Sequence, residues 1–487
     1  MPLFFRSFLK RTAAAAMVAV LAAGFQPAGA QAGLIDLIPL NQDAAMGAEQ
    51  HPKVVAQFGG VVKDARLSGW VADLGRRLAA VSAQPNFDWH FTVLDSDVVN
   101  AFALPGGYVY VTRGLLVLAN DEAEVAGVLA HEIGHVTARH SVARATRSTI
   151  TDMLAAGVGM ALGDATIAQL LNLGSGAMLA SYSREQELEA DSLGVETLAR
   201  AGYDPFAQAT FLETLRRYEQ YTSLRSGNNS GGFDLFASHP ATEERVNLAA
   251  QQARRYPPGG QRPTAPYVQA VDGMVWGDSP ENGFVRETVF AHPVLGLRFE
   301  VPRGFSLLNG ADEVVGKGPN GLAVSFDGGA VSGGIGDPVD YLVRGWAGNV
   351  PLQAVEPLTI AGRPAATGIT RTQTDAGTAD VRLVAVRWDA RTVYRFTFLA
   401  PAGRLGQADP LFRQTAASLR PLTQAEAAAL QPARVRVVVV RPGDTVEGFV
   451  AQMPRQAYAE ELFRIINNVP PGTELVPGRG VKIITGG

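Results

Sequence analysis

The chain has 487 residues, of which 47% are hydrophobic and 18% charged, with a net charge of -4 and no cysteine. This length predicts about three domains, at roughly 100–200 residues for each. The lack of cysteine excludes disulfides, iron–sulfur clusters, thiolate zinc sites and cysteine nucleophiles, so any metal must be bound by His, Asp or Glu. The near-neutral charge argues against nucleic acid as a partner, because phosphate binding needs clustered Lys and Arg.

The start of the chain has the order of charge, apolar run and small residues that is typical of a secretory signal. Basic residues before position 12 precede an apolar run over 13–25, and Ala28-Gly29-Ala30 follows it. The run is shorter than the roughly 20 residues that a membrane-spanning helix needs. We predict a signal peptide over 1–30, cleaved after about Ala30, and a mature protein in the periplasm.

Proline and glycine mark two joints in the rest of the chain. Pro257-Pro258-Gly259-Gly260 opens a segment rich in helix breakers, and a second such segment begins at Pro421. Because breaker-rich joints separate independently packed units, we expect few contacts across the second one. The predicted class is α+β, divided into a mainly helical domain (31–256), a linker (257–287), an α+β domain (288–420), a second linker (421–433) and a C-terminal module (434–487).

The first chemically informative segment is His131-Glu132-Ile133-Gly134-His135, in a helical stretch opened by Asp121 and Glu124 in a capping-box pattern. Two histidines at i and i+4 lie on one helix face, so both imidazoles can bind one ion at the ~2.0–2.1 Å that zinc requires. Glu132 lies about 100° around the helix, where it can hold a water against the metal. The alternative is a pair of buried helix histidines without a metal.

The next segment, 153–179, is apolar but interrupted by glycines. Its apolar runs are too short to span a membrane. We expect two buried helices that can also cover the cleft of the site, and peripheral contact with a membrane stays open as an alternative.

A third ligand is expected from the acidic segment that follows. At ~100° per residue, Glu185 and Glu189 share one helix face, whereas Glu187 and Asp191 lie on the apolar face. A buried carboxylate must be paired or bind a metal. We predict Glu187 as the third ligand, and Asp191 as an acceptor for a ligand histidine or as the partner of Arg245. A buried salt bridge with an arginine is the alternative for both acids.

The α+β domain has the alternation of β-strands. Residues 381–388 and 393–399 alternate bulky and polar side chains across a short polar turn, which indicates an antiparallel hairpin. Residues 297–301 predict a further strand, and helical patterns lie near 339–346 and 410–419. The pattern predicts an antiparallel sheet with helices. It contains no recognisable catalytic cluster, so we expect a packing or docking role.

The C-terminal module resembles a LysM-like βααβ unit. It contains a strand at 437–440, the turn Gly443-Asp444-Thr445, a helix over 458–466, the pair Asn467-Asn468 and a strand at 481–484. In such modules the Gly-Asp-Thr turn and the asparagine motif shape a glycan groove. The resemblance implies contact with peptidoglycan through 434–487, and a purely structural cap is the alternative.

Three ordered motifs resemble the zinc metallopeptidases of the forty-eighth metallopeptidase family: Asn100–Gly107 leading into Val111–Leu115, then His131–His135, then Glu187–Asp191. The resemblance covers about residues 40–255 and implies a mainly helical, gluzincin-type zincin domain with a small sheet.

The same resemblance implies Zn²⁺ bound by His131, His135 and Glu187, with Glu132 as the catalytic base. It also implies protein or peptide substrates and a role as an endopeptidase in quality control of envelope and outer-membrane proteins. One exported relative ends in helical tetratricopeptide repeats, whereas this chain ends differently. The rival hypothesis is an exported chaperone or cell-wall scaffold with a silent or structural metal site.

Within the first motif, a strand, a Pro-Gly-Gly turn and a second strand precede the metal helix. In zinc peptidases a sheet edge near the metal can pair with an extended substrate, so Asn100, Ala101, Phe102 and Ala103 form a candidate substrate edge. An ordinary hairpin packed on the core is the alternative. Asn100 could polarise a substrate carbonyl or hold the turn.

His239 precedes a proline and follows a glycine-rich loop at 226–232. Relatives with a comparable His-Pro context imply that it lies over the metal, as a fourth ligand that displaces the catalytic water or as a donor to the oxyanion. The alternative is a cap of its own helix. The remaining histidines are expected to be surface or satisfied core residues: His51, His90, His140 and His292.

Overall fold

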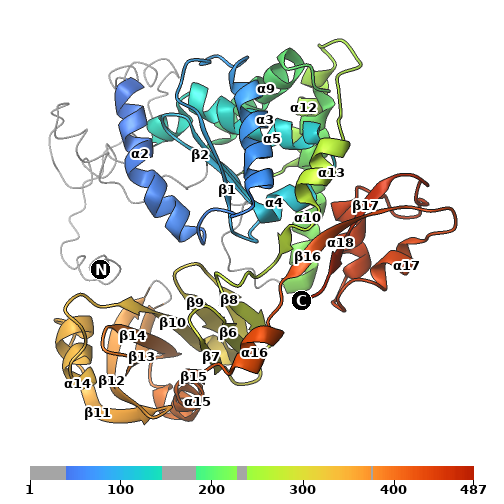
Figure 1. Ribbon diagram of the computed structural model, residues 1–487. Coiled ribbons are helices and arrows are strands. Elements are labelled where there is room, and N and C mark those ends of the chain that lie inside the picture. The colour runs from blue at the N-terminus through green and yellow to red at the C-terminus, as the bar shows by residue number, and fades with distance from the viewer. Residues whose placement is uncertain (1–39, 145–181, 227–238, 375–376) are drawn as a thin grey trace.

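A computed structural model describes residues 40–144, 182–226, 239–374 and 377–487 (Figure 1). The predicted signal peptide at 1–30 and the apolar segment at 153–179 lie outside the described residues. Helices and sheets are mixed, which confirms the α+β class. Within the described part of the chain, no helix has the length and hydrophobicity needed to cross a membrane.

The first domain contains a small sheet of β1 (His90–Leu94), β2 (Ala101–Leu104) and β3 (Tyr108–Thr112). The strand order is β1-β3-β2, with β1 parallel and β2 antiparallel to β3, so β2 lies at an edge. The hairpin between β2 and β3 turns at Gly106, where φ is +79° and a Cβ would lie 2.4 Å from Ala44 Cα. Glycine is required there by both backbone conformation and space.

Helices surround this sheet (Figure 1). The central one, α5, is buried from Glu122 to Val136, as expected of a helix that is apolar around most of its circumference. Its N-cap is Asp121, which accepts from Glu124 N, while Glu124 accepts from Asn120 N. In the described part of this domain the helices are α2 (Leu40–Gln57), α3 (Ala65–Ala79), α4 (Arg113–Leu118), α5 (Glu122–Thr137), α9 (Arg184–Arg200), α10 (Phe206–Ser226), α12 (Glu243–Ala253) and α13 (Ala265–Val271).

Glycines let α5 and α9 approach closely. A Cβ on Gly134 of α5 would lie 3.1 Å from Ala190 O, and a Cβ on Gly194 of α9 would lie 3.2 Å from His131 N. The two helices therefore meet backbone to backbone, and the side chains beside these contacts converge.

The second domain consists of two antiparallel sheets and confirms the predicted strand-rich pattern. The hairpin expected at 381–388 and 393–399 is β13 paired with β14. One sheet has the order β15-β7-β6-β5 and contains β5 (Phe284–Arg286), β6 (Val289–His292), β7 (Leu297–Glu300) and β15 (Arg420–Pro421). The other has the order β11-β12-β13-β14-β10-β9-β8 and contains β8 (Ser306–Asn309), β9 (Val314–Lys317), β10 (Ala323–Ala330), β11 (Gln353–Ile360), β12 (Arg363–Thr374), β13 (Gly377–Arg387) and β14 (Thr392–Pro401).

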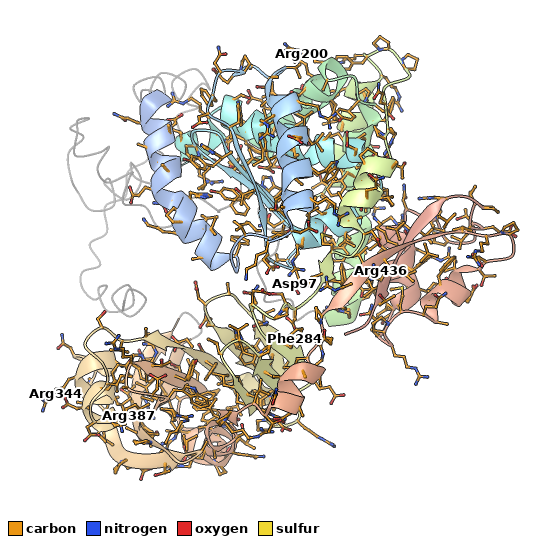
Figure 2. All side chains as sticks on the ribbon, viewed as in Figure 1. Asp97, Arg200, Phe284, Arg344, Arg387 and Arg436 are labelled. Carbon is orange, nitrogen blue, oxygen red and sulfur yellow. The ribbon has the colours of Figure 1, made fainter. Side chains whose placement is uncertain are left out.

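Helices cover this second domain at α14 (Pro338–Asp340), the π-helix at Tyr341–Ala347 and α15 (Leu405–Ala417). Figure 2 shows Asp97 at the end of the helical domain that faces the sheets, Arg200 at its opposite end, and Arg344 on the far side of the sheet domain.

The C-terminal module has the predicted βααβ order: β16 (Ala433–Val439), α17 (Val446–Val450), α18 (Ala459–Ile466) and β17 (Gly480–Thr485). Strands β16 and β17 pair antiparallel, and β16 also pairs with β4 (Val275–Trp276). Figure 1 shows the module beside α10 and α13.

The expectation of few contacts across the second linker is wrong. Lys482 Nζ donates to Val117 O at 2.7 Å and to Tyr267 OH at 2.8 Å, and the apolar side chains of the module join the core of the helical domain. Breaker residues describe the connection between two units, not the surfaces that those units bury against each other.

Both expected linkers contain regular structure. The segment at 257–287 contains α13, β4 and the start of the sheet domain at β5, and the segment at 421–433 contains α16 (Gln424–Ala429). The latter is capped by Thr423 and Glu426 in a capping box. Short elements of this kind lack the long periodicity that sequence patterns detect.

Candidate metal centre

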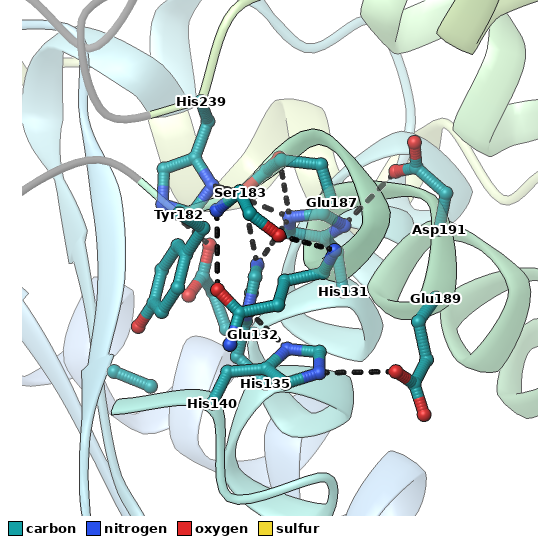
Figure 3. Close-up of polar contacts among 12 residues, drawn as sticks. His131, Glu132, His135, His140, Tyr182, Ser183, Glu187, Glu189, Asp191 and His239 are labelled. Atoms are coloured by element: carbon teal, nitrogen blue, oxygen red, sulfur yellow. Dashed lines mark hydrogen bonds and ion pairs between the residues drawn. The ribbon is translucent and has the colours of Figure 1, made fainter. Parts of the chain in front are cut away.

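Four side chains converge between α5, α9 and the segment before α12 (Figure 3). The ligand atoms of His131, His135, Glu187 and His239 lie within 4.8 Å of one another, and all four residues are buried. His135 Nε2 lies 3.0 Å from His131 Nε2 and 3.4 Å from Glu187 Oε1. Tetrahedral metal bonds of ~2.0–2.1 Å place ligand atoms about 3.3 Å apart. The spacing and the donor types therefore fit a metal ion.

The helical-wheel assignment of the acidic residues on α9 agrees with their burial. Glu187 and Asp191 are each 3% exposed, whereas Glu185 and Glu189 lie in the exposed class. Arg184 pairs with Glu244, at 2.7 Å, and so is not the partner of the buried acids.

Asp191 and Arg245 form a layer behind the candidate ligands. Asp191 Oδ1 lies 3.0 Å from His131 Nδ1, so its carboxylate faces the nitrogen that does not point to the cluster. Arg245 reaches both acids, with Nε 2.7 Å from Asp191 Oδ2 and Nη1 2.7 Å from Glu187 Oε2. Although burial opposes ionisation, the charge of Arg245 holds the pKa of Asp191 below its ordinary value. Both proposed partners of Asp191 are thus present in the structure.

Glu132 lies beside the cluster and is 2% exposed. Its Oε2 is buried without a hydrogen-bond partner among the described residues, and its Oε1 lies 3.9 Å from His239 Nε2. Burial raises the pKa of the Glu132 carboxyl, against the lowering influence of His239 and His131. An unpartnered buried carboxylate is unfavourable unless it serves a ligand, a water or a proton.

His239 belongs to the cluster, not to a helix cap. Its Nδ1 lies 2.8 Å from Glu187 Oε1 and 3.4 Å from His131 Nε2. The helix that follows is capped by Thr242, which accepts from Arg245 N. The capping alternative is therefore wrong, and the roles of fourth ligand and oxyanion donor remain.

Sequence reasoning missed His140. It is buried, with Nδ1 2.9 Å from His135 Nδ1 and Nε2 3.3 Å from Glu189 Oε2. Five residues after His135, it is off the face that a continued helix would share with that residue. Arg139, in the left-handed conformation with φ of +56°, reverses the chain just after α5 and returns His140 to the site. A positive φ at an arginine has no signal in the sequence.

Tyr182 was also missed. Its ring stacks on His135 with a centroid distance of 3.9 Å, and its hydroxyl lies 2.7 Å from Ser141 Oγ. Its place directly before the N-cap of α9 brings it to the same side as Glu187.

The residues of the candidate substrate edge direct their backbone groups alternately toward β3 and toward the open side of β2. Thr112 N donates to Asn100 O at 3.0 Å, so Asn100 faces β3. Because backbone groups alternate along a strand, Ala101 and Ala103 direct theirs to the open edge. Ser141 Oγ donates to Ala103 O at 3.4 Å, which agrees with that direction. The ring of Phe102 stacks on Tyr110 in the core, and Asn100 Oδ1 is buried without a partner in the described residues.

The fold and the site define an HExxH centre on a buried helix, completed by a carboxylate from a following helix. Residues 65–253 match Peptidase family M48. The chain is 34% identical to a putative beta-barrel assembly-enhancing protease of Vibrio cholerae, covering 41% of this chain and 41% of that protein. It is 29% identical to the beta-barrel assembly-enhancing protease of Escherichia coli, covering 51% and 54%.

A third relative is matched over most of its length. The metalloprotease YcaL of Escherichia coli is 32% identical over 214 residues, which cover 42% of this chain and 80% of that protein. The chain therefore belongs to peptidase family M48. It spans about half the length of the beta-barrel assembly-enhancing proteases it matches.

Proposed function

We propose that this chain is a zinc-dependent endopeptidase that hydrolyses peptide bonds in protein substrates. The observation that carries the proposal is the buried convergence of His131, His135 and Glu187 beside Glu132, whose Oε2 has no hydrogen-bond partner among the described residues. His and carboxylate donors with an adjacent carboxylate base form the donor set of catalytic zinc sites.

The chemistry follows from the positions of these groups. When bound, zinc acts as a Lewis acid that polarises a carbonyl and lowers the pKa of water. Glu132 accepts the proton of the attacking water and then delivers it to the nitrogen of the leaving amine. His239 Nε2, on the same side as Glu132, is placed to donate to the carbonyl oxygen as its charge develops.

We place the substrate backbone along β2. Ala101 and Ala103 offer the outward backbone groups of an edge strand that packs against α5, so an extended peptide can pair with them beside the metal helix. The substrate must then displace the hydrogen bond from Ser141 to Ala103 O.

The relatives named beta-barrel assembly-enhancing protease support envelope proteins as substrates and the periplasm as the location. For the C-terminal module, the packing of Asn467 favours the structural alternative: its side chain bonds Phe463 O and Lys482 O inside the module. Contact with peptidoglycan stays a prediction that a pull-down with purified sacculi can test, and peripheral membrane contact can be tested by vesicle flotation.

The experiment that tests the function is proteolysis of casein by the purified mature chain, with and without a chelator. We expect cleavage that stops with the chelator and returns with added zinc. A chain that binds zinc but cleaves neither casein nor unfolded outer-membrane proteins, and whose Glu132→Gln variant keeps full cellular function, would support the scaffold hypothesis instead.

A further inference from the structure

The two histidines of the HExxH motif are held from behind in different ways (Figure 3). His131 Nδ1 faces Asp191 directly, at 3.0 Å. His135 Nδ1 instead faces a second histidine, His140, at 2.9 Å, and His140 Nε2 faces Glu189 at 3.3 Å. Two consecutive hydrogen bonds thus connect the candidate ligand His135 to the surface, where the Glu189 side chain is 60% exposed.

Only one arrangement of protons satisfies these two hydrogen bonds when His135 binds a metal. The Nε2 of His135 points into the cluster and must present its lone pair, so Nδ1 carries the proton and donates it. His140 Nδ1 must then accept, which places the proton of His140 on Nε2. The carboxylate of Glu189 is acceptor-only and is the correct partner for that N–H.

The local backbone is shaped to hold His140 in this place. Arg139 adopts its left-handed conformation while its guanidinium bonds Asp43, with Nε 2.9 Å from Oδ2 and Nη2 2.7 Å from Oδ1. Left-handed backbone at a non-glycine residue is uncommon and is found mainly where the surroundings enforce it. The bidentate pair with Asp43 is such an enforcing contact.

We propose that His140 and Glu189 are positioning residues that fix the tautomer and ring orientation of His135 toward the metal. The inference rests on the proposed function, because it requires His135 Nε2 to bind zinc. Groups behind a metal ligand typically change metal affinity 10- to 100-fold when removed. The relay of hydrogen bonds from His135 through His140 to Glu189 therefore gives Glu189, an exposed residue outside the cluster, an influence on zinc affinity.

The test is a set of zinc affinities measured on the folded full-length mature chain by competition with a chromophoric chelator. In His140→Leu the acceptor for His135 is lost, and we expect affinity to fall roughly 10- to 100-fold. In His140→Asn the side-chain oxygen replaces Nδ1 as acceptor, and most of the affinity should return. Glu189→Ala should cause a smaller loss, because an exposed carboxylate is screened by water and salt.

The matched control is Glu196→Ala, which removes another exposed carboxylate of α9, one that pairs with Arg200 on the same helix. It should leave the affinity unchanged. The relay also predicts that Glu189→Ala has no further effect once His140 is Asn, since the asparagine does not extend to Glu189. Additive effects of the two substitutions would contradict the proposal.

A spectroscopic readout separates positioning from general packing. Long-range ¹H–¹⁵N correlation of the zinc-loaded chain should show His135 protonated at Nδ1 and His140 at Nε2, and the opposite tautomer of His140 would overturn the proposal. A parent chain that binds zinc while His140→Leu and Glu189→Ala bind it equally well contradicts the relay alone. A parent chain that binds no zinc contradicts the proposed function and the relay together.

Discussion

The helical domain and the sheet domain bury very different side chains. Ionisable groups gather around the candidate metal site of the helical domain, and eight of them are each at most 5% exposed: His131, Glu132, His135, His140, Glu187, Asp191, His239 and Arg245. The sheet domain instead packs phenylalanines, among which Phe398 lies 5.4 Å from Phe396 and 4.8 Å from Phe412 between ring centroids.

This difference distinguishes the side chains that serve the proposed chemistry from those that stabilise the fold. Burying charge is unfavourable unless the charges pair or bind a metal, and replacing a buried ion pair by apolar groups is often stabilising. The ionisable cluster is therefore explained by chemistry, whereas the aromatic core is explained by packing alone. Among the described residues, the candidate metal ligands gather only in the helical domain.

The largest effect should come from Glu132→Gln. The amide keeps the shape of the side chain but cannot accept the proton, so casein cleavage should fall roughly 10²- to 10⁴-fold. Zinc content and thermal unfolding should match those of the parent. Retained cleavage would show that another group acts as the base.

In the sheet domain, Phe398→Ala should change stability and leave the metal site unchanged. The residue is fully buried, so its truncation should lower the free energy of unfolding of this domain by about 3–5 kcal/mol and leave zinc affinity unchanged. Denaturant unfolding followed by tryptophan fluorescence measures the effect. Leu308→Ala, at a side chain that is 49% exposed, is the control and should change the value by less than about 0.5 kcal/mol.

His239→Ala distinguishes the two remaining roles of that residue. If His239 donates to the oxyanion, casein cleavage should fall roughly 10²- to 10³-fold with zinc retained. If it blocks the metal as a fourth ligand, basal cleavage should rise. Unchanged cleavage would contradict both roles.

The last predicted effect depends on pH and concerns Lys482, which ties the C-terminal module to α4. Burial lowers the pKa of Lys482 to about 7 from 10.5, so unfolding takes up a proton between these pH values. Stability should therefore rise with pH across this window, by at most about 1.4 kcal/mol per pH unit. Lys482→Met should flatten the rise, whereas Lys63→Met, at a side chain that is 79% exposed, should not. Equal slopes in the parent and Lys482→Met would contradict the assignment.

The features of the site that could be predicted from the sequence are those that helical periodicity determines. The positions of His131 and His135 on one face, and the burial of Glu187 against the exposure of Glu185, follow from 3.6 residues per turn. The position of His140 depends on one left-handed residue, Arg139, and could not be predicted in this way.

The packing of the C-terminal module against the helical domain could not be predicted from the sequence, for a different reason. The pairing of β4 with β16 joins residues about 160 positions apart, and β4 is only two residues long. Neither the partner nor the register of so short a strand is encoded in a local pattern. The two strands and the longer helix of the module depend on local signals, and the structure has them near the expected positions, at β16, β17 and α18.

The central proposal, a zinc site completed by Glu187, is tested most directly by the metal content of three purified chains. The parent and Glu185→Ala should each contain one zinc per chain after dialysis, because Glu185 lies on the exposed face of α9. Glu187→Ala should contain little or none, because it loses a buried carboxylate whose Oε1 lies 3.4 Å from His135 Nε2. Zinc retained in Glu187→Ala and lost in Glu185→Ala would contradict the assignment.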